Sequence, residues 1–153
     1  AYTCRVSVTD KATNQAKIVE KSFEVLDPAF GIVGFHTSYD QAGNHPAPMQ
    51  GVAGQTLWLH FDTVNFTRDA ATKQPINEIT IVVRDATGKP TNEEPLVYLI
   101  KQGVKEESSA IDWDLPLPMN RPGSYTVELR AKDKLSNKEY QMKFPVTVYN
   151  SVK

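Results

Sequence analysis

The sequence predicts an all-β protein built as an antiparallel β-sandwich. Short runs of alternating apolar and polar residues recur along the chain, as in strands with one buried face. Ten prolines and eight glycines separate these runs, which is typical of chains made of short strands and turns. No segment shows the apolar period of an amphipathic helix.

Composition limits the classes of function. With 153 residues, 40% hydrophobic and 23% charged, the chain suits one ordinary domain with a packed core. Its net charge of −1 argues against nucleic acid or an anionic membrane as a partner. A single cysteine excludes an intrachain disulfide and a Cys/His metal cluster. No apolar run is long enough to span a membrane.

The first predicted element is a β-hairpin. Residues 2–8 alternate, so that Tyr2, Cys4, Val6 and Val8 share one face. A polar turn over 10–15 leads into a second strand over 19–26, which Asp27-Pro28 ends. On this face we expect Cys4 to be a small core residue.

Seven further strands are predicted over residues 30–150, with turn signals about every ten residues. The two clearest place Leu57, Leu59 and Phe61 inward with Trp58 outward, and Trp113 inward. A long polar loop covers 40–54. The expected strands are 30–39, 55–66, 78–84, 96–100, 110–117, 125–131 and 140–148.

The beginning of the chain repeats near its end. Residues 2–14 match residues 125–137 with a constant difference of 123 in number. We expect this difference to drop by two after the turn, which aligns Phe23 with Phe144 and Val25 with Val146. The repetition predicts a slice of a tandem array. Residues 1–26 would be the closing hairpin of a preceding domain, 27–29 a linker and 30–150 a complete domain, all within a longer precursor.

Two segments resemble bacterial immunoglobulin-like repeats. Pro122–Asp133, followed by Ser136-Asn137 and Phe144–Val148, resembles their last two strands, and residues 54–61 resemble their second strand. The resemblance implies an Ig-like sandwich of about seven strands, related to fibronectin type III and cadherin-like modules. It also implies that Tyr125, and Tyr2 in the fragment, are tyrosine-corner residues.

The chain departs from antibody domains because it has no cysteine pair and because Trp58 lies in the second strand rather than the third. The family resemblance implies an extracellular, cell-surface or periplasmic location.

We therefore expect a non-catalytic module of a larger exported protein, acting as a spacer or protein-interaction domain. The alternative is an accessory carbohydrate-binding module, which would need a row of exposed aromatic side chains. Only Trp58 is clearly outward among the candidates, which are Tyr39, Trp58, Tyr98, Tyr140 and Tyr149. A third hypothesis, a small hydrolase, would need a concave pocket with convergent polar groups, and we expect none.

Polar residues give no firm site. The imidazole set of His36, His45 and His60, with Asp40, has spacings that match no zinc motif. Asp112 and Asp114 are expected on a solvated outer face, with nothing beside them to raise a pKa.

No Ser/His/Asp constellation is evident, because Ser38, Ser108, Ser109 and Ser124 have no base beside them in the sequence. We expect no catalytic residue and no cofactor.

The two related turns offer the only calcium candidates, Asp10, Asn14, Asp133 and Asn137. Turn stabilisation by side-chain oxygens explains them without a metal. The other residues that we single out, Trp113 and Phe144, are expected to be structural.

An apolar hairpin without a domain of its own has an exposed face and two free edges. We expect residues 1–26 to self-associate with another copy, because the sandwich already has its own closing hairpin.

Overall fold

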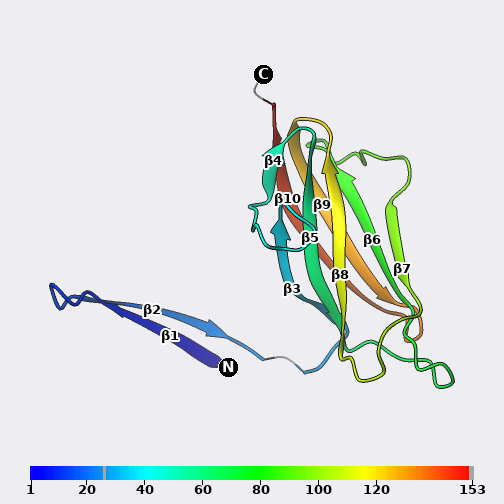
Figure 1. Ribbon diagram of the computed structural model, residues 1–153, viewed down its shortest axis with the longest axis horizontal. Helices are drawn as coiled ribbons and strands as arrows, with labels where there is room; N and C mark the ends of the chain where they lie inside the picture. Colours follow the sequence, from blue (N-terminus) through cyan, green and yellow to red (C-terminus); the bar gives the residue numbers. More distant parts are fainter. Residues whose placement is uncertain (26, 152–153) are drawn as a thin grey trace.

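The computed structural model describes residues 1–25 and 27–151 and is all-β (Figure 1). No described residue lies in a helix, so none belongs to a helix able to cross a membrane. The ten strands are β1 Tyr2–Thr9, β2 Ala16–Phe23, β3 Gly31–Ser38, β4 Gln50–Val52, β5 Gln55–Val64, β6 Asn77–Arg84, β7 Leu96–Ile100, β8 Ala110–Met119, β9 Gly123–Asp133 and β10 Lys138–Tyr149.

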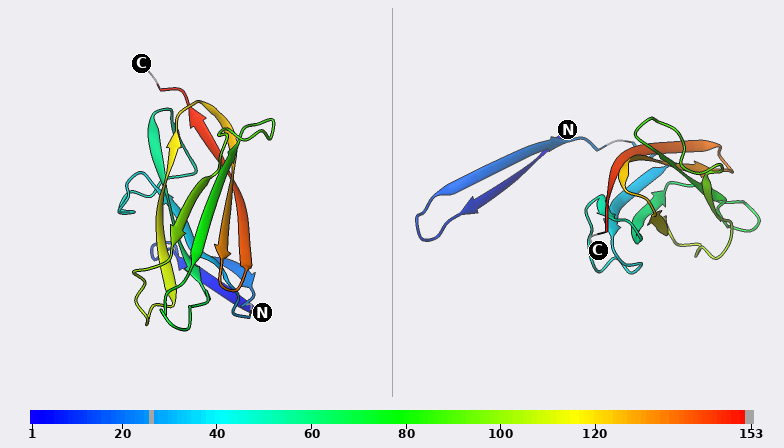
Figure 2. Two further views of the ribbon diagram at one scale, coloured as in Figure 1. Left: turned by 90° about the vertical axis from the view of Figure 1, so that its right-hand side faces the viewer. Right: turned by 90° about the horizontal axis from the view of Figure 1, so that it is seen from above.

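Strands β3–β10 form a sandwich of two sheets (Figure 2). One sheet has the order β4-β10-β9-β6-β7 and the other β3-β5-β8, and all neighbours are antiparallel except β4 and β10. The predicted fold class is confirmed at this level. Strand β4 lies within the segment predicted as a loop, and it pairs through only three residues.

The core lies between the sheets and follows the predicted alternation. Leu57, Leu59 and Phe61 of β5 are buried, as is Trp113 of β8. The Trp113 ring stacks near Phe61, and its Nε1–H donates to Thr63 Oγ1 at 3.1 Å. A buried indole needs such a partner. Phe144 is also buried in this core.

Tyr125 fixes the entry to β9. Its hydroxyl donates to the carbonyl of Arg121 at 2.9 Å and also lies 3.3 Å from that of Pro122. Gly123 has a φ of 150°, in a region that L side chains rarely adopt. A Cβ there would come within 3.2 Å of the Tyr125 hydroxyl.

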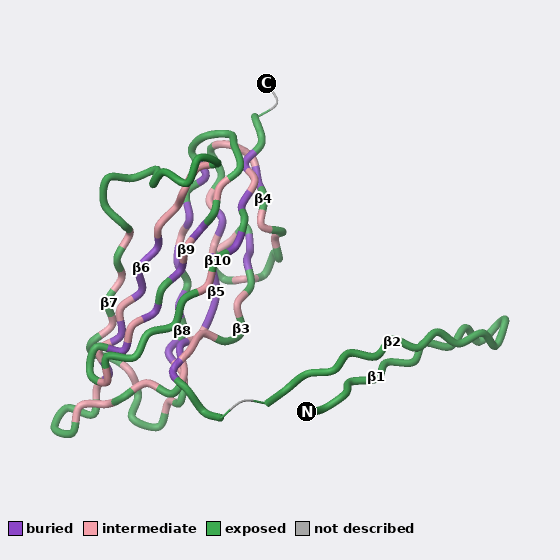
Figure 3. Tube along the Cα trace, turned by 180° about the vertical axis from the view of Figure 1, so that it is seen from behind, coloured by how far each residue is buried: buried purple, intermediate pink, exposed green. Residues whose placement is uncertain are grey.

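The β1–β2 hairpin stands apart from the sandwich, and all of its residues are exposed (Figure 3). The expectation that Cys4 is a core residue is therefore wrong, because no described part of the chain covers it. Tyr2 is exposed and stacks on Phe23 with ring centroids 5.6 Å apart. Within the described ranges its hydroxyl forms no hydrogen bond, so it does not act as a corner residue. Leu26, the last residue of the predicted second strand, lies outside the described residues.

One type of Asp-capped turn occurs three times. The first residues are Asp10, Asp69 and Asp133, and each carboxylate accepts from the amide two residues later, at 2.8, 3.0 and 3.0 Å. The fifth residue of each turn has a φ of 56–59°, in the left-handed region. These residues are Asn14, Lys73 and Asn137.

The equal turns correct the predicted alignment of the two hairpins. Asp10 N–H donates to Gln15 O at 2.9 Å, and Asp133 pairs with Lys138 in the same way. The number difference therefore stays at 123 through the second strand instead of dropping by two. Phe144 then corresponds to Lys21 rather than to Phe23.

Candidate functional site

The β1–β2 hairpin presents one largely apolar face, here called the hairpin surface. The register opposes Tyr2 to Phe23 and Val6 to Val19, and side chains alternate between faces along each strand. The surface consists of Tyr2, Cys4, Val6, Val8, Lys17, Val19, Lys21 and Phe23. Val8, at 67% exposure, is its most open apolar side chain.

Two lysines limit what can cover this surface. Lys21 opposes Cys4, and Lys17 opposes Val8. Lys21 occupies the position that buried Phe144 holds in β10, and an ammonium group is costly to bury without a partner. In a complex, the two lysine head groups must therefore lie at the rim of the contact, where water reaches them, or meet carboxylates of the partner.

Both outer edges of the hairpin are unpaired. In the described part of the chain, β1 pairs only with β2. Free N–H and C=O groups along an edge can accept another strand, so the hairpin offers both a face and two edges for association.

A second candidate region is a hydrogen-bonded chain on the outer face of the β3-β5-β8 sheet. His60 is only 6% exposed. Its Nδ1 lies 2.6 Å from Asp114 Oδ1, and its Nε2 lies 2.6 Å from Ser38 Oγ. Neither this contact nor the burial of His60 was predicted.

The order Ser38–His60–Asp114 is that of a catalytic triad, but the geometry does not suit a nucleophile. Ser38 has 0% exposure, so no substrate atom can reach its Oγ. Its hydroxyl proton is donated to the carbonyl of Asp40, which can only accept. The Ser38 oxygen also lies within hydrogen-bond distance of His60 Nε2, and this chain of contacts fixes the loop after β3.

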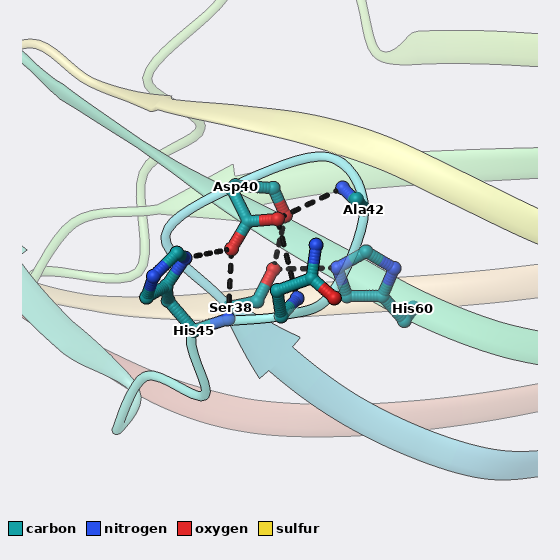
Figure 4. A network of polar contacts seen from close by, with 6 residues as sticks. Ser38, Asp40, Ala42, His45 and His60 are labelled. Carbon is teal, nitrogen blue, oxygen red and sulfur yellow. Dashed lines mark hydrogen bonds and ion pairs between the residues drawn. The ribbon is translucent and has the colours of Figure 1, made fainter.

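Asp40 shapes this loop (Figure 4). Its carboxylate accepts from the amides of Ala42, Asn44 and His45 at 3.1, 3.2 and 2.8 Å, and from His45 Nδ1 at 2.9 Å. Burial works to raise the pKa of Asp40, but the hydrogen bonds from His45 and Asn44 outweigh it and hold the pKa below its usual range. The loop thereby covers His60.

The three histidines do not converge on a metal position. His36 stacks on His60 with centroids 4.8 Å apart, while exposed His45 bonds to Asp40. No group of three or more His, Cys, Asp or Glu side chains among the described residues is arranged to hold a metal ion.

The outer face also carries an interacting carboxyl pair. Asp62 pairs in register with Asp112. Burial first, and then the neighbouring Asp112 carboxyl, raise the pKa of Asp62. Asp112 and Asp114 are exposed on the outer face, as predicted, but the sequence did not reveal that Asp112 lies beside Asp62 and that Asp114 bonds to His60.

The four calcium candidates are parts of turns. Asp133 accepts from Thr67 N at 2.8 Å, Leu135 N at 3.0 Å and Ser136 Oγ at 2.6 Å. Asp10 accepts from Ala12 N and from a threonine hydroxyl. Asn14 and Asn137 are the left-handed residues of the same turns. Hydrogen-bond donors therefore occupy the carboxylate oxygens that a cation would need.

The candidate aromatic side chains do not form one row. Trp58 is half-buried on the outer face of β5, and Tyr98 packs against the core. Tyr140 and Tyr149 are exposed but nine residues apart on β10, which places them on opposite faces of that strand. Tyr39 follows β3.

Comparisons with known proteins give little guidance. No family model matches the chain, and no curated protein is significantly similar to it. The soluble domain of PmoD from Methylocystis is 13% identical, with a TM-score of 0.40 over 76% of this chain and 90% of that one. A family 123 glycoside hydrolase from Clostridium perfringens is 14% identical, with a TM-score of 0.39 over 81% of this chain and 28% of the enzyme. Likenesses at this level carry no argument about function.

Proposed function

We propose that this chain is a non-catalytic immunoglobulin-like module of a larger exported or cell-surface bacterial protein, with a protein-interaction or spacer role. The observation that carries the proposal is the hairpin surface, an exposed face of six apolar residues and two lysines. The largest exposed apolar patch of a soluble protein is often a contact surface for a partner. A spacer alone would not need it.

A second copy of the chain is the proposed partner. Two hairpin surfaces can pack face to face with the ammonium groups of Lys17 and Lys21 at the rim, or two free edges can pair. A hairpin of eight-residue strands offers about 25 Å by 10 Å, on the order of 300 Å² per copy. This is below the standard interface size, so the association should be weak and concentration-dependent.

Sedimentation velocity over a wide concentration range tests the proposal. The full chain should show a rising mass, and a chain lacking residues 1–29 should remain a monomer. If the two hairpin surfaces pack face to face, Val6→Glu should abolish association, whereas Ser7→Glu, on the opposite face of the same strand, should not. If two free edges pair instead, both variants should still associate. If the full chain and the truncated chain are both monomers throughout, intermolecular pairing is refuted.

The alternative role, accessory carbohydrate binding, is less well supported because the exposed aromatic side chains of β10, Tyr140 and Tyr149, lie on opposite faces of that strand.

A further inference from the structure

The β8–β9 turn lies at the end of the sandwich opposite the linker to the hairpin (Figure 1). Residues of this turn, of the neighbouring strands and of the β6–β7 loop line a cavity. Its volume is about 540 Å³, within the range of small-molecule sites. We did not expect a concave pocket with polar groups, so its presence departs from the sequence-based prediction.

The floor of the cavity is apolar core. Leu117 of β8, Val127 of β9, and Val146 and Val148 of β10 line it and are buried. These side chains come from both sheets, so the cavity is a place where the sheets separate. The half-buried side chains of Val83, Leu96 and Tyr125 complete this floor and are partly open to the cavity, so an apolar ligand body could cover them and gain from leaving water.

The rim carries two cations and one carboxylate, so its net charge is positive. Lys89, from the β6–β7 loop, and Arg121, from the β8–β9 turn, are its two cations. Neither forms an ion pair with any described residue. The single rim carboxylate, Asp85, is turned to its own loop, where it accepts from Thr87 N, Thr87 Oγ1 and Lys89 N at 2.9, 2.6 and 3.1 Å.

The remaining polar side chains of the rim suit an oxyanion. The amides of Asn92 and Asn120 line the cavity and form no side-chain hydrogen bond to any residue that the structure describes. Arg121 can bind a carboxylate through two parallel hydrogen bonds. The lining includes no histidine, cysteine or serine.

We propose that this cavity binds a small amphipathic anion, a carboxylate on an aliphatic body, with the body on the apolar floor and the carboxylate at Arg121 and Lys89. This site is separate from the hairpin surface, and the inference does not depend on the proposed association.

The test is an NMR titration of the full chain with decanoate and, as a neutral match, decanol. Decanoate should produce saturable shifts confined to the cavity lining. Decanol should bind roughly tenfold more weakly, since a charge-assisted contact is lost. The double variant Lys89→Gln/Arg121→Gln should bind decanoate as weakly as it binds decanol. Lys101→Gln, which removes a cation outside the lining, should change nothing.

Three results would overturn the proposal. These are an absence of saturable shifts, equal binding of decanoate and decanol, and loss of affinity on Lys101→Gln as large as in the double variant. Equal binding would identify an apolar site instead. Because the hairpin takes no part, a monomeric full chain that still binds decanoate would refute the proposed association and leave this site intact.

Discussion

Replacement of Asp133 by alanine should be among the more damaging single changes to the sandwich, because this carboxylate joins two loops. Asp133 is 0% exposed. It caps its own turn through Leu135 and Ser136, and it also accepts from the amide of Thr67, in the loop after β5. Hydrogen bonds to charged groups contribute about 1.5–3 kcal/mol each, and a buried amide without a partner adds a penalty.

Because water can replace part of the turn contacts, we expect a loss of about 3 kcal/mol for Asp133→Ala. For a domain of this size that corresponds to a fall in Tm of roughly 10 °C. Urea unfolding followed by tryptophan fluorescence measures it. Both tryptophans, Trp58 and Trp113, lie in the sandwich, so the signal is independent of the hairpin.

The chain supplies its own matched controls. Asp69 caps an equivalent turn at the surface, with no bond to a second loop, so Asp69→Ala should be clearly milder. Asp10→Ala changes the same turn in the exposed hairpin and should leave sandwich unfolding unchanged. If Asp133→Ala is no worse than Asp69→Ala, the contact with Thr67 contributes nothing and the reasoning is refuted.

Two further predictions concern the core and the outer face. Trp113→Ala should cost roughly 3–5 kcal/mol through cavity formation, whereas Tyr125→Phe should cost about 1 kcal/mol for one hydrogen bond at the surface; the reverse order in urea unfolding would contradict the core role of Trp113. Asp62→Asn should raise the Tm at pH 7. The pKa of Asp62 is higher in the folded state than in the unfolded state. The protonated carboxyl therefore stabilises the folded state below the unfolded pKa, and this stabilisation is lost as the pH rises through the folded pKa. An asparagine avoids that loss, so the gain should disappear near pH 3, below the ordinary Asp pKa of about 3.9. An equal gain at both pH values would count against this explanation.

Within the sandwich, alternation was sufficient to predict the long strands and most of their inward residues, because these strands have one buried face. It could not reveal β4. Gln50-Gly51-Val52 is too short to alternate, and a Cβ at Gly51 would overlap the side chain of Met119. Gly51 thus packs against the end of the Met119 side chain, and a glycine among loop residues gives no strand signal.

The polar network was missed for a different reason. Ser38 and His60 are 22 residues apart, and His60 and Asp114 are 54 apart. His60 and Asp114 were available as outward positions, and they pair directly across β5 and β8. Which outward residues meet depends on the order β3-β5-β8, which alternation within single strands does not contain. The burial of His60 further depends on how Asp40 folds the following loop.

The similarity between the two ends of the chain has two parts, the turn and the strands, and they differ in what they show. The turn is local chemistry, because the same Asp-capped turn at Asp69 joins no such hairpin pair. Its recurrence at Asp10 and Asp133 is therefore weak support for a duplicated domain. The strands carry the stronger signal, since Tyr2 corresponds to Tyr125 and Val25 to Val148.

At the position of buried Phe144, however, the hairpin has Lys21. The N-terminal hairpin thus retains the residues that form a hairpin but lacks one that would fill a core. A lysine on an apolar face also disfavours indiscriminate sheet pairing. This combination suits a hairpin that stays at the surface and engages a partner over part of one face, rather than one that closes the interior of a second sandwich.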